Sequence, residues 1–483
     1  MKTTVFSSKT NSFSFKFMIN FLVFTRKFSR AKMNFPMIET ESNKEVLFDS
    51  YFGLRMITLN RPKKLNALNM IMTKNIYEKL IEWKRSSLAK IILLRGINNR
   101  ALSAGGDVVA IAELCRLDME KGYKMAMEYF ELEYRLDYLI ATFKEKPYVS
   151  LMDGITMGGG AGLSVHAPFR VATENTVFAM PETDIGFFPD AGLSFFLSRM
   201  DGEVGKYLGM TSERLYGFDT LISGIATHYV PSERLDSLIA RLSELDTNDC
   251  SSKDYFNVVD RAIDEFSGEP PRNYKYRLGG ETREAIDRCF KYKKIENVFK
   301  ALKKEGTEWA NSTIDTLNRR SPTSIKVALR EIQEAKKWNI LQAFNNELNI
   351  TSYLLKTHDF IEGIEAKLVK KPSVKPVWKP SIISEVSDKL VDTFFKSCKD
   401  SPQLNISGDL ISVQYQDYPY NYGLPTEIDL EKSIRNCISN NVPVNSIRDV
   451  VFDIFFKVSP NKPGLSIKLD DILFRKRFGQ LSN

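Results

Sequence analysis

Residues Asp153–Gly162 read DGITMGGGAG, a glycine-rich stretch that directly follows the apolar run PYVSLM at Pro147–Met152. The apolar run predicts a buried strand, and the triple glycine predicts a helix that opens with bare backbone amides. Amides at a helix N-terminus carry positive partial charge and suit a developing oxyanion. Two other interpretations stay open. One is a dinucleotide loop, whose G-x-G-x-x-G spacing is not cleanly met; the other is glycine needed only for tight packing.

Strand and helix patterns alternate around this stretch. Short β-branched-rich runs occur at Leu54–Asn60 and Lys90–Arg95, and apolar residues recur at helical spacing over Met70–Ser87 between them. A further strand is expected around Phe169–Ala172. This alternation predicts an α/β fold with a mostly parallel sheet.

The second half of the chain has mainly helical patterns, from about Ser212 onward, and the segment KPSVKPVWKP at Lys371–Pro380 marks a boundary. Helices are expected over Glu233–Leu245, Asp254–Phe266, Thr282–Arg288, Ile295–Lys304, Ser324–Glu347, Ser384–Ser397, Glu431–Ser439 and Ile447–Lys457. We divide the chain into a leader (1–38), an α/β core (39–210), a helical region (211–380) and a C-terminal extension (381–483).

The leader carries most of the net charge. The chain has a formal charge of +8, and residues 1–38 contain seven Lys and Arg but no acid, so the remaining chain is near +1. This composition is typical of a mitochondrial transit peptide, with a tail of no targeting role as the alternative. A nearly neutral body argues against extensive contact with nucleic-acid phosphates. The five cysteines lack paired spacing and there are three histidines, so neither disulfides nor a metal site is expected.

Two further segments carry candidate chemistry. LSAGGD at Leu102–Asp107 follows the strand at Lys90–Arg95, and its paired glycines can point an amide into a cavity. MPETDIGFFPD at Met180–Asp190 places Glu182 and Asp190 among apolar residues, where carboxyl groups acquire perturbed pKa values. Taken singly, the first is equally well explained as a turn and helix cap, and the second as surface acids.

The order of the three segments resembles the crotonase superfamily. The resemblance runs from about Val46 to Pro380, beginning with ITLNRPKKLNALN at Ile57–Asn69. SPTSIKVALR at Ser321–Arg330 and HDFIEGIEAKL at His358–Leu368 indicate the 3-hydroxyisobutyryl-CoA hydrolase family within it. The resemblance implies a crotonase-like core of ββα units with parallel sheets, followed by helices and a C-terminal appendage.

The resemblance also implies roles for individual residues. The family's oxyanion hole consists of two backbone amides, which match Gly106 and Gly159. Glu182 matches a nucleophile that attacks the thioester, and Asp190 matches an acid that assists proton transfer. Glu133 matches a substrate-contacting glutamate. The reaction would cleave 3-hydroxyisobutyryl-CoA to 3-hydroxyisobutyrate and CoA, a step of valine catabolism, with no cofactor beyond the CoA of the substrate.

Departures from the family pattern qualify this interpretation. Hydratases of the superfamily carry a second glutamate where this chain has Gly162, which makes an enoyl-CoA hydratase or isomerase the weaker alternative. Leu193 and Ser194 replace two glycines after Asp190, and Ser103 replaces a cysteine. The bulkier pair is expected to narrow the pocket or restrict the loop. His166 matches the pattern, but we assign it no role, because a packed histidine is commoner than a catalytic base.

The extension supplies the alternative from another class. It resembles extended fungal members of the hydrolase family, some of which are built into the small subunit of the mitochondrial ribosome. Its aromatic segment Val413–Leu424 contains Tyr415, Tyr418, Tyr420 and Tyr422. These side chains either anchor a partner or pack on the helical region. We expect a matrix protein with an acyl-CoA substrate, no membrane span and an extension dispensable for thioester cleavage; a homo-oligomer is left open.

Overall fold

The computed structural model describes residues 44–245, 252–396, 401–406, 413–458 and 462–477. The predicted leader at 1–38 lies outside these residues. From Glu45 onward the chain forms one unit.

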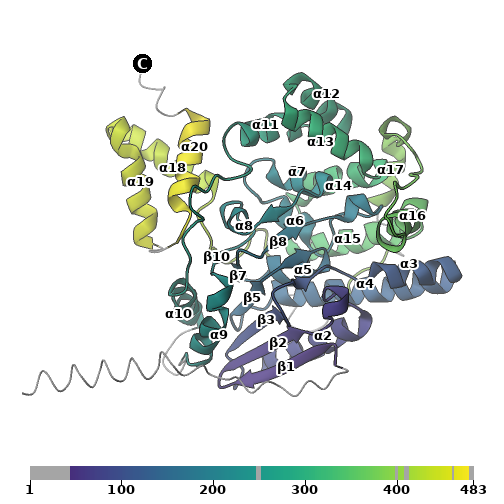
Figure 1. Ribbon diagram of the computed structural model, residues 1–483, viewed down its shortest axis with the longest axis horizontal. Helices are drawn as coiled ribbons and strands as arrows, with labels where there is room; N and C mark the ends of the chain where they lie inside the picture. The colour runs from purple at the N-terminus through teal and green to yellow at the C-terminus, as the bar shows by residue number, and fades with distance from the viewer. Residues whose placement is uncertain (1–43, 246–251, 397–400, 407–412, 459–461, 478–483) are drawn as a thin grey trace, which may run out of the picture. The chain divides into compact units, whose positions relative to one another are not determined.

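Two sheets form the centre of the fold (Figure 1). The larger has the order β1-β2-β3-β5-β7-β10 and is parallel except for the β1–β2 hairpin; the smaller has the order β4-β6-β8-β9, with only β9 antiparallel. The strands are β1 (Val46–Tyr51), β2 (Leu54–Leu59), β3 (Ile91–Gly96), β4 (Ala101–Ser103), β5 (Tyr148–Met152), β6 (Ile155–Met157), β7 (Phe169–Ala172), β8 (Val177–Ala179), β9 (Leu215–Tyr216) and β10 (His228–Tyr229).

The predicted α/β class and parallel sheet are confirmed. All six residues of β2 and all five of β5 are buried, because central parallel strands are covered on both faces and need apolar side chains throughout. The smaller sheet was not predicted. Its strands are two or three residues long, too short for a recognisable alternation.

Helices make up most of the remaining described chain. They are α2 (Met70–Arg85), α3 (Val108–Leu117), α4 (Met119–Ala141), α5 (Gly159–Val165), α6 (Leu193–Leu197), α7 (Val204–Thr211), α8 (Phe218–Ile222), α9 (Leu235–Ser243), α10 (Ser252–Asp264), α11 (Gly280–Phe290), α12 (Ile295–Glu305), α13 (Glu308–Arg319), α14 (Pro322–Ala335), α15 (Ile340–Leu354), α16 (His358–Ile364), α17 (Asp388–Phe394), α18 (Glu427–Ser439), α19 (Val444–Val458) and α20 (Leu465–Lys476). Shorter helical turns are η1 (Pro62–Lys64), η2 (Glu182–Asp184), η3 (Ser232–Arg234), η4 (Glu365–Val369) and η5 (Ile383–Glu385).

The single helix predicted over residues 324–347 is wrong. The structure has two helices there, α14 and α15, because Asn339 begins a new one. Its side chain accepts from the Gln342 amide at 2.8 Å, and the Gln342 side chain accepts from the Asn339 amide at 2.9 Å. This reciprocal capping box satisfies two amides at a helix start. Helix α14 packs on α6 and α7, and α15 packs on α4, which surrounds the candidate site with helices.

The last three helices have their own apolar cluster. Leu430, Ile434, Val451, Leu469 and Ile472 are buried together with side chains of α8. Figure 1 shows α18, α19 and α20 grouped together, and α20 packs on α8 and α11.

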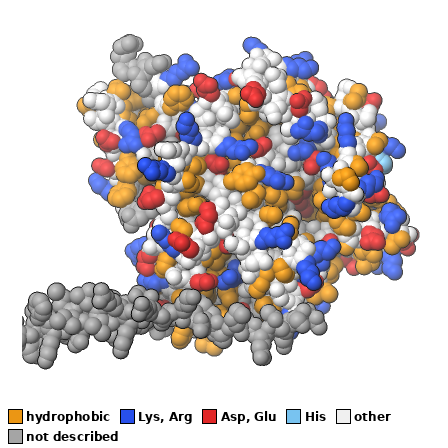
Figure 2. All heavy atoms as spheres, in the orientation of Figure 1, with side chains coloured by type: hydrophobic (Ala, Val, Ile, Leu, Met, Phe, Trp, Pro, Cys, Tyr) orange, Lys and Arg blue, Asp and Glu red, His pale blue; other side chains and the backbone are white. Residues whose placement is uncertain are grey.

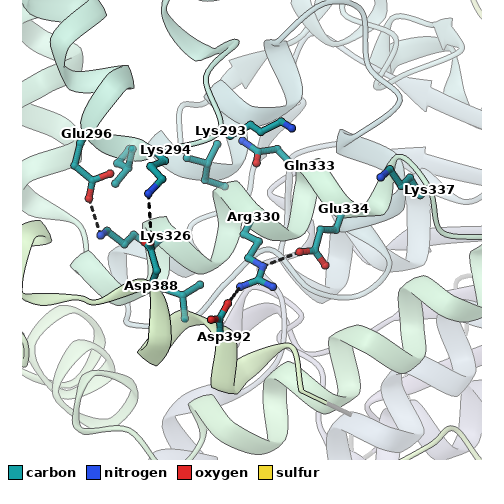
Figure 3. A pocket seen from close by; sticks show the side chains of 13 residues that line it. Lys293, Lys294, Glu296, Lys326, Arg330, Gln333, Glu334, Lys337, Asp388 and Asp392 are labelled. Atoms are coloured by element: carbon teal, nitrogen blue, oxygen red, sulfur yellow. Dashed lines mark hydrogen bonds and ion pairs between the residues drawn. The ribbon is translucent and has the colours of Figure 1, made fainter.

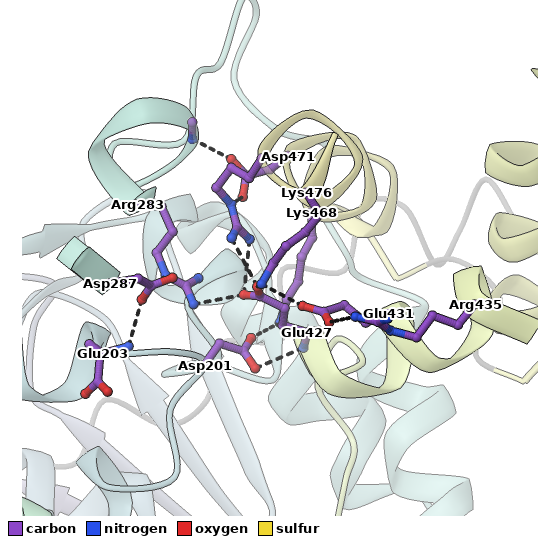
Figure 4. Close-up of polar contacts among 12 residues, drawn as sticks. Asp201, Glu203, Arg283, Asp287, Glu427, Glu431, Arg435, Lys468, Asp471 and Lys476 are labelled. Atoms are coloured by element: carbon purple, nitrogen blue, oxygen red, sulfur yellow. Dashed lines mark hydrogen bonds and ion pairs between the residues drawn. The ribbon is translucent and has the colours of Figure 1, made fainter. Parts of the chain in front are cut away.

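A buried ion network joins these helices to the preceding chain (Figure 4). The Glu427 carboxylate accepts from two Arg475 nitrogens at 3.0 and 3.1 Å and lies 2.8 Å from an Arg283 nitrogen. Lys468 pairs with Asp201 at 2.7 Å. Contacts of this kind dock α18 and α20 against helix α11 and the turn before α7.

The aromatic segment 413–424 packs on the core. Tyr415 donates to the Ala141 carbonyl at 3.0 Å, and its own carbonyl accepts from the Ile340 amide. The Tyr420 ring stacks on Phe256 with centroids 5.0 Å apart. Of the two interpretations of these tyrosines, the structure therefore supports intramolecular packing.

The surface agrees with the expectation of a nearly neutral body. On the face drawn in Figure 2, Lys and Arg side chains are interspersed with Asp and Glu. Among the described helices none is long and apolar enough to cross a bilayer.

Candidate active site

The first glycine turn presents the Gly106 amide. Gly106 forms an isolated parallel bridge with Leu68. The Leu68 amide donates to the Gly105 carbonyl at 2.8 Å, and the Asp107 amide donates to the Leu68 carbonyl at 2.7 Å. The Gly106 amide between them has no backbone acceptor within the described residues. Ser103, the departure noted above, stabilises the turn, because its hydroxyl accepts from the Gly105 amide at 3.2 Å.

The second glycine turn lies against the first. Gly158 has a φ of +51°, a conformation that favours glycine, and α5 begins at Gly159. A Cβ placed on Gly105 would lie 3.5 Å from both Gly158 Cα and the Gly159 nitrogen. The two amides predicted to form an oxyanion hole, those of Gly106 and Gly159, therefore belong to turns so close that a single added methyl group on one would touch the other.

Two glutamates face the second turn. A Cβ placed on Gly158 would lie 2.9 Å from Glu182 Oε1, and one on Gly159 would collide with Glu133 Oε1. Glu182 opens the turn η2 after β8, and Glu133 projects from α4. Both carboxyls are almost fully buried, with residue exposures of 6% and 2%. Only glycine leaves room for these carboxyls beside the amides.

Asp190 completes the predicted set. It is 5% exposed, and Oδ2 accepts from the Tyr134 hydroxyl at 2.7 Å. Since that hydroxyl donates to Asp190, the Thr351 hydroxyl 2.8 Å away donates to Tyr134. Tyr134 comes from α4 and Thr351 from α15, so two helices distant in sequence orient the acid.

Three further buried acids were missed from the sequence: Asp137, Glu331 and Glu347, each with an exposure of 0%. Both oxygens of Asp137 lack hydrogen-bond partners among the described residues, and a Cβ placed on Gly162 would lie 2.7 Å from one of them. Asp137 lies one turn after Glu133 on α4, so an i, i+4 pair of acids amid apolar residues was the available signal.

Glu347 explains one departure from the family pattern. Its carboxyl accepts from the Gly192 amide at 2.6 Å, the Ser194 amide at 3.1 Å and the Ser194 hydroxyl at 2.5 Å. Leu193 beside them is fully buried in the main apolar cluster. The bulkier pair therefore restrains the start of α6, in line with the expectation of a restricted loop.

Burial raises the pKa of every acid in this cluster. The pKa of Asp190 rises to about 7 although the hydrogen bond from Tyr134 lowers it, and the pKa of Glu347 rises to about 8 although the hydrogen bonds from Ser194 lower it. Burial and then the Asp190 charge raise the pKa of Glu133 to about 8. The same two causes raise the pKa of Glu182 well above its ordinary value. At neutral pH the cluster therefore holds protons that it can donate.

A separate group of His228, Asp260 and Asp264 has metal-ligand composition, with one ligand atom of each within 4.8 Å of the others. The buried Lys462 ammonium lies among them, 2.6 Å from His228 Nε2, 2.9 Å from Asp260 and 3.2 Å from Asp264. The chain itself thus supplies the cation of this group, which ties the turn before α20 to α10.

The pocket in Figure 3, about 480 Å³ between α12, α14 and α17, contains none of the predicted site residues. Its charges are largely paired within the chain. Lys326 lies 2.7 Å from Glu296, Lys294 lies 3.0 Å from Asp388, and Arg330 contacts Asp392 at 2.5 Å. The last two pairs join α17 to the helical region.

Comparison with known proteins identifies the fold as that of an established family. Residues 54–395 match the enoyl-CoA hydratase/isomerase family. The chain belongs to this family. A carnitinyl-CoA dehydratase from Mycobacterium thermoresistibile has a similar crystal structure, with a TM-score of 0.66, 33% identity, and coverage of 75% of this chain and 99% of that one. The predicted crotonase fold is thus confirmed.

Two relatives bear on the finer classification. The mitochondrial 3-hydroxyisobutyryl-CoA hydrolase of Gallus gallus is 42% identical over 357 residues, covering 74% of this chain and 90% of its own. Small ribosomal subunit protein mS47 of Neurospora crassa is 42% identical over 454 residues, covering 91% of this chain and 87% of its own. Because the second match leaves out only about 9% of the chain, it takes in more than half of residues 381–483.

Proposed function

We propose that this protein is a mitochondrial matrix hydrolase that cleaves 3-hydroxyisobutyryl-CoA to 3-hydroxyisobutyrate and CoA. The observation that carries the proposal is the placement of Glu182 and Glu133 against the Gly158–Gly159 turn, with the Gly106 turn beside it. The similarity to a mitochondrial hydrolase of that name supports the substrate and the compartment.

In the proposed reaction the thioester carbonyl accepts hydrogen bonds from the Gly106 and Gly159 amides. Because its raised pKa favours the protonated form, Glu182 first passes its proton to a neighbouring acid of the cluster and then attacks the carbonyl carbon as a carboxylate. The C–S bond breaks, and Asp190 donates its proton to the departing thiolate. Water then attacks the mixed anhydride and gives its proton to Asp190, which releases the acid and restores Glu182. Two preorganised donors to an oxyanion contribute on the order of 6 kcal/mol of transition-state stabilisation.

The remaining residues favour hydrolysis over hydration. A side chain at Gly162 would collide with the Ala191 Cβ at 2.7 Å and with Asp137, so a second glutamate has no room at this position. Glu133 lies against Gly159, where it would contact the acyl group rather than activate water for addition to a double bond. We therefore place hydratase activity second.

A substrate comparison tests the proposal. The purified protein is incubated with 3-hydroxyisobutyryl-CoA and, separately, with crotonyl-CoA. CoA and the acyl products are then separated by chromatography. A thiol reagent is avoided because it would also react with the five cysteines of the protein. We expect CoA release from the first substrate without added metal or nucleotide. Hydration of crotonyl-CoA without CoA release would contradict the proposal.

The second candidate function is that of a component of the small mitochondrial ribosomal subunit. It is favoured by the similarity to mS47, which extends over most of the C-terminal extension. The nearly neutral body fits attachment through proteins better than through RNA phosphates. Sedimentation of mitochondrial extract tests it: co-migration with small subunits at moderate salt supports this role, and recovery only at the top of the gradient argues against it. Both functions can reside in one protein.

A further inference from the structure

A tyrosine of the C-terminal extension bonds a histidine beside the candidate site. The Tyr418 hydroxyl lies 2.8 Å from His166 Nδ1, and His166 Nε2 lies 3.0 Å from the Ala191 carbonyl oxygen. A carbonyl only accepts, so Nε2 carries the proton and donates to Ala191, and Nδ1 therefore accepts from Tyr418. The direction of both bonds follows from the chemistry of the groups.

The environment keeps His166 in this one form. The residue is 3% exposed, and burial lowers the pKa of its ring to about 4. The ring is therefore neutral at physiological pH, with its proton on Nε2. A neutral ring held by two hydrogen bonds has a fixed orientation.

The peptide that His166 holds adjoins Asp190. Ala191 has a φ of +61° and Gly192 a φ of +79°, two successive residues in the left-handed region. For alanine this conformation costs about 1 kcal/mol and persists only where surrounding contacts impose it. His166 bonds the carbonyl of this turn on one side, and Glu347 accepts from the Gly192 amide on the other. The turn fixes where Asp190 lies relative to Tyr134.

The extension is held firmly at this point. The Tyr418 ring meets the Phe195 ring edge-on with centroids 5.1 Å apart. Two Arg199 nitrogens donate to the Gln416 carbonyl at 2.9 and 2.6 Å, and Arg199 also pairs with Asp417 at 3.4 Å. Tyr418 is thus placed against His166 by Phe195, which contacts its ring, and by Arg199, which holds the two residues before it.

We infer that Tyr418 and His166 are positioning residues for the catalytic acid Asp190, so that the C-terminal extension completes the active site. The inference rests on the proposed hydrolase function. It replaces the sequence-based expectation that the extension is dispensable for thioester cleavage. Any partner that drew residues 413–418 away from the core would release the Ala191 turn and lower activity.

Histidine NMR tests the geometry without reference to activity. The chain has three histidines, so selective ¹⁵N labelling gives a simple spectrum. We expect one ring, assigned by His166→Gln, to show the Nε2–H tautomer and not to titrate between about pH 5.5 and 8. Tyr418→Phe keeps the aromatic ring but removes the hydroxyl, so its Nδ1 resonance should shift. Tyr420→Phe is the matched control, because its stacking on Phe256 is retained.

Kinetics then test the consequence for the reaction. We expect Tyr418→Phe to lower kcat about tenfold with KM within about twofold, because a slightly displaced acid impairs chemistry more than binding. Tyr420→Phe should match wild type in both. A wild-type His166 that titrates near its ordinary pKa, an unshifted resonance in Tyr418→Phe, or full activity of Tyr418→Phe would overturn the inference. An inactive wild type would instead refute the proposed hydrolase function, and the NMR result would still decide the geometry.

Discussion

The docking of the last three helices depends on Glu427, and replacing it with Gln is a quantitative test. Glu427 is 5% exposed, and Arg283 and Arg475 beside it are 4% and 7% exposed. Burial by itself raises the pKa of Glu427, but hydrogen bonding from Arg475 and the Arg283 charge lower it from 4.5 to about 2. That difference corresponds to about 3 kcal/mol. Removing the charge leaves each buried guanidinium group with one carboxylate partner, Asp287 for Arg283 and Asp471 for Arg475, and costs up to a similar amount.

Hydrogen exchange measures this change locally. We expect Glu427→Gln to accelerate amide exchange in peptides of α18 and α20 about 100-fold, the equivalent of about 3 kcal/mol. The matched control is Glu431→Gln, whose partners Arg435 and Lys476 are 68% and 37% exposed, so its loss should stay below about 1 kcal/mol. Equal exchange in the two variants would refute the argument that the buried network holds these helices.

Two further predictions concern the acid cluster. Burial raises the folded-state pKa of Asp190 from 3.8 to about 7 and of Glu133 and Glu347 from 4.5 to about 8. The stability that these acids contribute is therefore fully present below their unfolded values and is lost progressively as pH rises from about 4 through 7 to 8. The thermal midpoint should fall over that range, less steeply in Glu347→Gln; a rising midpoint would contradict this. Gly159→Ala should lower kcat about 100-fold, because its Cβ would collide with Glu133 Oε1. Gly423→Ala is the control: its added Cβ would have its nearest contact at 3.6 Å, so this variant should match wild type in the same assay.

Local motifs allowed much of the site to be predicted. Gly106 and Gly159 each lie shortly after a strand, so the turns that contain them could be predicted from neighbouring residues in the sequence. Glu182 and Asp190 lie within one segment of eleven residues; the structure brings Glu182 to the second glycine turn and Asp190 close enough for its charge to raise the pKa of Glu182. The strand at Phe169–Ala172 was predicted with its observed bounds.

Contributions from distant helices could not be predicted in this way. Glu347 lies in a predicted helix, but an acid on an amphipathic helix is usually exposed, and only the packing of α15 on α4 buries it. Tyr134 gains its role from Asp190, 56 residues away in sequence. The tyrosines at 415–422 have the composition of an interface or of a core, and the pattern alone does not distinguish the two.

The rate of CoA release by the Glu182→Gln variant tests the central claim most directly. Wild type, Glu182→Gln and the partly exposed Glu131→Gln are assayed with 3-hydroxyisobutyryl-CoA, and substrate binding is measured at equilibrium in parallel. The account predicts similar turnover by wild type and Glu131→Gln, and a loss of more than about 1000-fold in Glu182→Gln with binding retained, because the amide keeps the shape of the carboxyl but cannot act as the nucleophile. Comparable turnover by wild type and Glu182→Gln would contradict it.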